Sequence, residues 1–166
     1  MTIKKGDGRI ARFSSCERYR YTLTITWDTT LQTCHFLMLN PSTADEVKND
    51  PTVERAERYA RSWGYGALLV TNIFAWRATD PKAMKAQDDP VGPENDNAIV
   101  EAAETTALTV CAWGNHGSHM GRSQHVLDLL AKSGTPLHCL TVTGAGEPGH
   151  PLYLRKDLQP IPLPSP

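Results

Sequence analysis

The sequence lacks several features that would place it in a familiar functional class. No apolar run approaches membrane-spanning length, and the polar, basic start carries no apolar signal segment. Lysine and arginine (17) almost balance aspartate and glutamate (18), so no overall basic field indicates nucleic-acid binding. Motifs of phosphate-binding loops, dinucleotide sites, zinc proteases and serine hydrolases are absent. The composition, 40% apolar and 21% charged, is that of an ordinary globular protein.

The spacing of the four cysteines excludes the common cysteine-based sites. None of the four cysteines lies within metal-finger or Cys-x-x-Cys distance of another. Cys34, Cys111 and Cys139 fall inside apolar, strand-like runs, which predicts buried, reduced thiols and a cytoplasmic protein. His116 and His119 sit in a Gly/Ser loop with no obvious third ligand. We therefore expect no metal and no cofactor.

The length of 166 residues suits one domain with one sizeable core. The glycine-rich, basic residues 1–12 are predicted to form a flexible arm. Proline alternates near the other end, so residues 159–166 are predicted to be an extended Pro-rich tail. Residues 13–158 would then form a single α/β domain.

Within that domain, predicted strands alternate with predicted helices. Apolar or alternating stretches predict strands at residues 18–27, 34–39, 67–75, 108–112 and 137–142. Capping and apolar periodicity predict helices at residues 51–63, 94–106 and 122–132. The first two strands are expected to pair as an antiparallel hairpin. The alternation as a whole predicts a three-layer α/β/α sandwich with a mainly parallel central sheet.

Polar residues interrupt this pattern at the ends of the strands. Asn40, Asn72, Trp113-Gly114 and His150 each lie at or just past the end of an apolar strand. In a parallel sheet these ends face one way, which would build a cleft with two amides, an imidazole and aromatic walls. Such a set suits a planar ligand with donors and acceptors, such as a nucleobase. Taken singly, each of these residues has an equally good structural explanation: Asn40-Pro41 and His150-Pro151 as turns, and Asn72 as a tie between loops.

Two family resemblances enter through longer stretches of sequence. Over nearly its whole length the chain resembles an uncharacterised bacterial and phage family built on a domain of unknown function; the matching segments include FLMLNPSTAD, NDPTVERAERYARSWGYGALLVTNIFAWRATDPKAM, DDPVGPENDNAI, AWGNHG and HPLYL. The order of its motifs is also similar to the uracil-DNA glycosylase superfamily; the motifs are MLNPS, LLVTNIF, VCAWGNHG and GHPLYL. This second resemblance implies a uracil-DNA-glycosylase-like fold.

The glycosylase resemblance also implies roles for individual residues. Asn40 would orient a water or contact the base, Asn72 would bond the base edge, and His150 would donate to a base carbonyl. The first motif has an amide where the most active branch has a carboxylate, and Asp45 is the candidate to supply one. The Ser-Pro pair expected after His-Pro is missing. The remaining substrate-binding candidates are Pro41, Ser42, Phe74 as a stacking ring, Arg77, Trp113, Gly114, Asn115, and Leu152 or Tyr153 as a wedge.

Three functions follow as hypotheses. The first is an enzyme that recognises a nucleobase and cleaves an N-glycosidic bond in DNA or a nucleotide. The second is a non-catalytic binder of a base, nucleotide or modified DNA. The third is a transferase or hydrolase acting on a modified base, with Asp45, Asp80 or Arg77 active, because the long loop at residues 76–93 is typical of functional segments. No membrane partner is expected.

Overall fold

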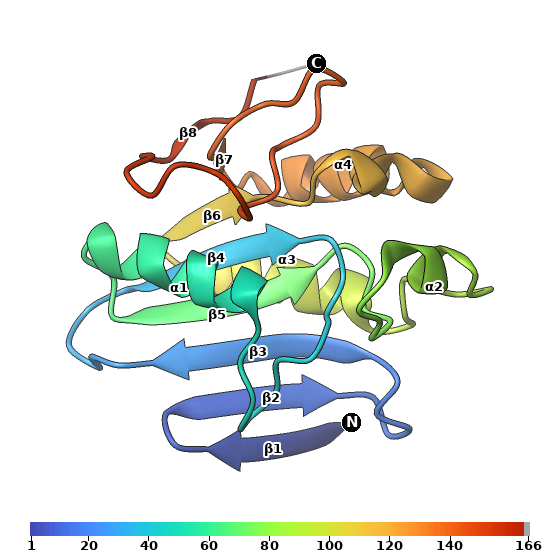
Figure 1. Cartoon of the computed structure of the whole chain (residues 1–166), viewed down its shortest axis with the longest axis horizontal. Helices are drawn as coiled ribbons and strands as arrows, with labels where there is room; N and C mark the ends of the chain where they lie inside the picture. The colour runs from blue at the N-terminus through green and yellow to red at the C-terminus, as the bar shows by residue number, and fades with distance from the viewer. Residues whose placement is uncertain (165–166) are drawn as a thin grey trace.

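The computed structural model describes residues 1–164 and contains one eight-stranded sheet (Figure 1). Seen across the sheet, the strand order is β1-β2-β3-β5-β4-β6-β7-β8. In that order the strands are Thr2–Gly6, Arg9–Phe13, Arg20–Thr26, Ala67–Asn72, Thr33–Met38, Leu108–Cys111, Leu137–Cys139 and Ile161–Pro162.

The prediction of a mainly parallel, uracil-DNA-glycosylase-like sandwich is wrong, because the sheet is mixed and mostly antiparallel. Parallel pairing is limited to β4 with β5, β4 with β6, and β6 with β7. The four other pairings are antiparallel, and they lie on both sides of this parallel part. The alternation of helices and strands after residue 33 predicted only the parallel part, whereas the antiparallel strands come mainly from residues 2–26.

The predicted hairpin between residues 18–27 and 34–39 does not form. Strand β5 lies between β3 and β4, antiparallel to β3 and parallel to β4. A hairpin is found instead at residues 2–13, which we expected to be a flexible basic arm: β1 and β2 pair around the turn at Asp7-Gly8. Gly8 has a φ of +66°, and Asp-Gly is a strong signal for such a tight turn. The basic composition of this segment led us to predict a flexible arm, although two strands form there.

The predicted tail is also partly structured. Strand β8 pairs with β7, placing Cys139 opposite Ile161 and His138 opposite Pro162. Ser165 and Pro166, the last two residues of the predicted tail, lie outside the described residues.

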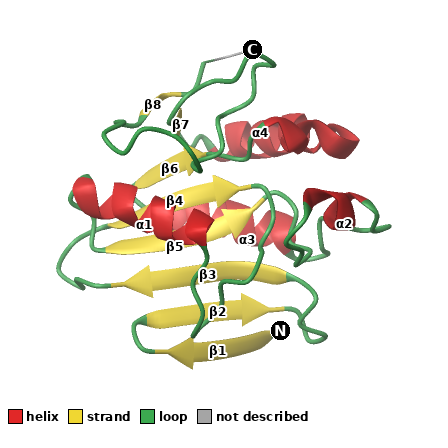
Figure 2. Cartoon of the chain, viewed as in Figure 1, coloured by secondary structure: helices red, strands yellow, loops and turns green. Residues whose placement is uncertain are grey.

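Helices cover both faces of the sheet (Figure 2). Helix α1 (Pro51–Ser62) packs on one face against alternate residues of β4, such as Phe36 and Met38. Helices α3 (Asn95–Thr105) and α4 (Arg122–Ser133) pack on the other face against Leu37. The predicted helix positions are therefore close to those observed. A five-residue helix, α2 (Pro81–Lys85), lies in the long loop, and a 3₁₀ segment, η1 (Asn115–Gly121), follows β6.

Cys34, Cys111 and Cys139 are buried free thiols, as expected, and Cys16 is an exposed free thiol. Burial raises the pKa of each of these three thiols above its ordinary value. Within residues 1–164, no helix combines the length and the apolar character needed to cross a bilayer.

Candidate functional site

A cavity of about 330 Å³ opens where β4 and β5 end and α1 begins. Its lining residues come from six separate parts of the chain: the start of β3, the end of β4 with the loop after it, the start of α1, the last residue of β5, the loop that leads into α2, and the loop near residue 150. Six of the residues predicted for the site line it, namely Asn40, Pro41, Ser42, Asn72, His150 and Leu152. Parallel pairing of β4 with β5 places Met38 beside Asn72, so the two strands end together at the cavity.

The amide of Asn40 is held with its oxygen free. Its Nδ2 donates to the backbone oxygen of Ala78 at 2.8 Å and to that of Pro41 at 3.2 Å. Because carbonyl oxygens can only accept, the nitrogen must lie on this side. Oδ1 of Asn40 is therefore the amide atom left for a ligand, as an acceptor.

The amide of Asn72 has the opposite arrangement: its oxygen is engaged and its nitrogen is free. Its Oδ1 accepts from Nη2 of Arg20 at 3.2 Å, and Arg20 also lines the cavity. A guanidinium group has donors but no acceptor, so the oxygen of the amide must face Arg20. Nδ2 of Asn72 is thus left for a ligand, as a donor.

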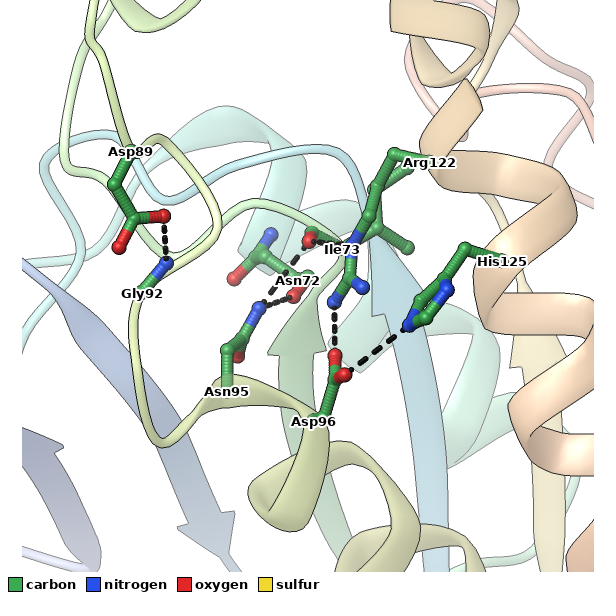
Figure 3. A network of polar contacts seen from close by, with 8 residues as sticks. All are labelled: Asn72, Ile73, Asp89, Gly92, Asn95, Asp96, Arg122 and His125. Carbon is green, nitrogen blue, oxygen red and sulfur yellow. Dashed lines mark hydrogen bonds and ion pairs between the residues drawn. The ribbon is translucent and has the colours of Figure 1, made fainter. Parts of the chain in front are cut away.

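The backbone at the end of β5 is fixed from the other face of the sheet. Figure 3 shows the side chains of Asn95 and Arg122 converging on the backbone of Asn72 and Ile73. Asn95 Nδ2 donates to Asn72 O at 2.8 Å, and Arg122 Nε donates to Ile73 O at 2.7 Å. Arg122 is in turn paired with Asp96 at 2.7 Å. These contacts limit the movement of Asn72 relative to the cavity.

His150 presents its Nε2 as a donor. Its Nδ1 accepts from the backbone N–H of Leu152 at 3.3 Å, which in the neutral ring leaves the proton on Nε2. Burial lowers the pKa of His150 below its ordinary value; the nearby Asp50 opposes this shift and the nearby His116 adds to it. The ring is therefore neutral at pH 7.

Gly114, another predicted site residue, positions His150 without lining the cavity itself. Its N–H donates to Pro148 O at 2.8 Å, which joins the end of β6 to the loop that carries His150. Gly114 has a φ of +73°, and a Cβ atom added there would lie 3.3 Å from Cβ of His150. A side chain at residue 114 would therefore strain the backbone and press on the imidazole.

Two cavity residues that we did not predict carry charge. Asp50 is the N-cap of α1, its Oδ1 accepting from Val53 N at 2.8 Å and its Oδ2 from Ala44 N at 3.2 Å. The sequence indicated the cap, but only the packing of α1 brings it to the cavity together with Thr52. No such signal in the sequence marked Arg20, which is buried at the start of β3. The N-terminus of α1 adds a positive partial charge at the same place.

The predicted aromatic walls are not part of the cavity. Phe74 and Trp113 are both buried in the core that α3 and α4 cover. Trp113 Nε1 donates to Glu147 Oε2 at 2.6 Å, which ties it to the loop before His150. Neither ring is positioned to stack on a ligand, so the walls are apolar side chains instead, including Met38, Leu39, Pro51 and Val53.

Other predicted residues lie at the surface beyond the cavity. Asn115 Oδ1 accepts from Thr143 Oγ1 at 2.6 Å. Tyr153 is 97% exposed and borders a depression next to the cavity that also contains Arg55, Arg58 and Lys156. That depression shares Pro51 and Leu152 with the cavity.

The predicted catalytic carboxylate, Asp45, does not line the cavity. It borders a neighbouring depression with Lys48 and Arg77, and its Oδ1 accepts from the backbone N–H groups of Val47 and Lys48. Arg77 Nη1 donates to Glu17 O at 3.0 Å. Asp80 caps α2 by accepting from Lys82 N. These contacts give all three side chains structural partners, which weakens the transferase or hydrolase hypothesis.

Among residues 1–164, no three His, Cys, Asp or Glu side chains gather closely enough to hold a metal ion.

Comparison with known proteins identifies one family. The sequence model of the family described as "Protein of unknown function (DUF1643)" matches residues 20–152 of the chain. No curated protein and no solved structure matches it. The matched range contains every residue described above that lines the cavity.

Proposed function

Because the chain belongs to the DUF1643 family, whose function is not established, we propose a function from its own cavity: the protein recognises a nucleobase, either free or in a nucleotide or nucleic acid. One observation carries this proposal. Asn40, Asn72 and His150 come from separate parts of the chain, and they offer one acceptor and two donors to a single cavity.

The size and lining of the cavity suit such a ligand. A volume of about 330 Å³ is at the lower end of the range of small-ligand sites, which is about 300–1,000 Å³. Apolar side chains such as Met38, Val53 and Leu152 would contact the faces of a ring, while the polar atoms would bond its edge. Nucleobases combine these two properties, since they are flat and carry both donors and acceptors.

Cleavage of an N-glycosidic bond is the second candidate, and the state of His150 favours it. A neutral imidazole with its proton on Nε2 can donate to a base oxygen as negative charge develops there. The N-terminus of α1 would favour the same charge. In a hydrolysis, water would add to the sugar carbon as the bond to the base breaks. Among residues 1–164, Asp50 is the one carboxylate that lines the cavity, and it is engaged by two backbone N–H groups, so cleavage would depend mainly on stabilising the departing anionic base rather than on a free general base for the water.

Oligonucleotides test both candidates together. Purified protein would be incubated with single- and double-stranded oligonucleotides carrying uracil, 5-hydroxymethyluracil, hypoxanthine or mismatches, and released base would be measured by mass spectrometry. Asn40→Ala and His150→Ala alter the cavity, while Asn115→Ala removes an amide outside it and serves as the matched control.

The outcomes separate the candidates. Base release that is lost in Asn40→Ala and His150→Ala but kept in Asn115→Ala supports cleavage. Saturable binding of a base or nucleotide without release supports the non-catalytic binder. Neither binding nor release by the folded wild-type protein contradicts nucleobase recognition.

A further inference from the structure

Arg20 is a buried cation at the cavity that no carboxylate neutralises directly. Its side chain is 1% exposed, with Nη1 donating to Ala44 O at 2.8 Å and Nη2 to Asn72 Oδ1 at 3.2 Å. Within residues 1–164, its Nε has no partner and none of the ion pairs includes it. Burial lowers the pKa of Arg20 to about 10, against the raising effect of Asp50, so it stays charged at pH 7.

Such a residue is costly to the fold, because a buried charge without an opposite partner loses its hydration. Both of its contacts need a donor, since Ala44 O can only accept and Oδ1 of Asn72 accepts from Arg20. The contact to Asn72 is the one that also fixes the direction of a side chain lining the cavity. A buried charge that costs stability in this way is the kind of exception expected at a functional site.

We propose that Arg20 is a positioning residue that makes Asn72 an obligate hydrogen-bond donor toward the ligand. This inference rests on the proposed recognition of a nucleobase. With Oδ1 of Asn72 engaged by a group that can only donate, Nδ2 is the polar atom that remains for the ligand. The ligand must then present an acceptor to Asn72, such as a carbonyl oxygen or an unprotonated ring nitrogen, and an exocyclic amine is rejected there.

Two features strengthen this effect. The positive charge of Arg20 polarises the amide, which makes Nδ2 a stronger donor in a cavity of low dielectric. The backbone of Asn72 is held from behind by Asn95, so the residue cannot easily move away from Arg20.

The first test replaces the donor by an acceptor. Asn72→Asp keeps the shape of the side chain and places a carboxylate beside Arg20, so this variant is expected to fold. Affinities for uracil, cytosine, hypoxanthine and adenine would be measured by calorimetry. The base that wild type binds best should lose about tenfold or more in affinity, because the ligand acceptor would face a carboxylate oxygen. This loss should exceed the loss in Asn72→Ala, which removes the donor without adding repulsion.

The second test frees the amide to turn. Glutamine at residue 20 can donate or accept, so Arg20→Gln should reduce the affinity ratio between the best and the worst of the four bases. Arg20→Lys supplies only donors and should keep that ratio. A merely structural role of Arg20 would change stability, measured by thermal unfolding, but would leave the ratio unchanged in both variants.

The results distinguish failure of this inference from failure of the proposed function. Wild type that binds none of the four bases contradicts both. Wild type that binds a base, with Asn72→Asp binding it equally or more tightly, overturns only the role of Arg20. Should Arg20→Gln fail to fold, the comparison of Asn72→Asp with Asn72→Ala decides the matter alone.

Discussion

At the scale of single residues, the cavity owes its pattern of donors and acceptors to the partners behind it. Each of the three side chains that we propose to bind a base has its other polar atom engaged by a group with only one hydrogen-bonding role. Asn40 faces carbonyl oxygens, Asn72 faces a guanidinium, and His150 faces a backbone N–H. The pattern is therefore fixed before any ligand binds, which reduces the free-energy cost of recognition.

A buried histidine outside the cavity leads to a prediction about stability and pH. His35 is completely buried between Thr71 and Thr109, and burial lowers its pKa to about 3. Between that pKa and the unfolded value of about 6.5, the unfolded chain binds the proton more readily. The free energy of unfolding should thus be lower by about 2 kcal/mol at pH 5 than at pH 7.5.

Urea unfolding at several pH values checks this prediction. His35→Gln should be less stable at pH 7.5 but should show a much weaker fall between pH 7.5 and pH 5. An equally steep fall in this variant would mean that other groups cause the pH dependence. His150, whose pKa is lowered in the same direction, would add a smaller contribution of the same sign.

At the scale of elements, the start of α1 connects the helix with the floor of the cavity. Asp50 caps the helix through Val53 and also binds Ala44, whose carbonyl oxygen accepts from Arg20. Asp50→Ala should lower the free energy of unfolding by about 2 kcal/mol, since a cap and a second bond to a backbone N–H are both lost.

Asp80→Ala is the matched control for this variant. Asp80 also precedes a proline and caps a helix, but α2 has only five residues and its cap is exposed. We expect a loss of less than about 1 kcal/mol in urea unfolding. Equal losses in the two variants would argue against the additional role of Asp50 in the loop.

The turn after β6 gives a second prediction at this scale. Gly114→Ala should destabilise the fold by about 1–3 kcal/mol, because its backbone lies in a region open almost only to glycine. It should also weaken base binding by displacing His150. Gly121→Ala has a positive φ of 65° but no atom within 4 Å of the added Cβ. That control should lose stability while keeping its affinity for the base, as measured by calorimetry.

At the scale of the whole molecule, the net charge of −1 hides a local distribution of cations. Lys48 and Arg77 border one depression next to the cavity, together with Asp45, and Arg55, Arg58 and Lys156 border another, together with Glu54. Both depressions share lining residues with the cavity, so a strand with one base in the cavity would have cationic side chains within reach in either depression.

This arrangement predicts a difference between free bases and oligonucleotides. Lys48→Glu combined with Lys156→Glu should weaken oligonucleotide binding and reduce the slope of log affinity against log salt by about 0.7 for each lost phosphate contact. The affinity for the free base should not change. Fluorescence anisotropy at several salt concentrations measures the first effect, and calorimetry the second. An unchanged salt slope would place the phosphates elsewhere or favour a free base as ligand.

The sequence by itself determined the positions of most elements after residue 33. Continuous apolar runs predicted β4 and β6, and the Asp50-Pro51 cap predicted the start of α1. It also predicted that Asn40, Asn72 and His150 would lie in one cleft, and all three line the cavity. Their position at or after the end of an apolar run is a local feature of the sequence. The buried thiols of Cys34 and Cys111 followed from the same kind of pattern.

Only the tertiary structure decided how these elements meet. The insertion of β5 between β3 and β4 depends on pairing between residues far apart in the chain. The burial of Arg20 beside Asn72 likewise joins residues of two different strands. The burial of Phe74 and Trp113 and the distance of Asp45 from the cavity have the same origin. A local sequence pattern indicates only which face of its strand or helix a side chain occupies. The residues that hydrogen-bond to that side chain and bury it come from distant parts of the chain, and the local pattern carries no information about them.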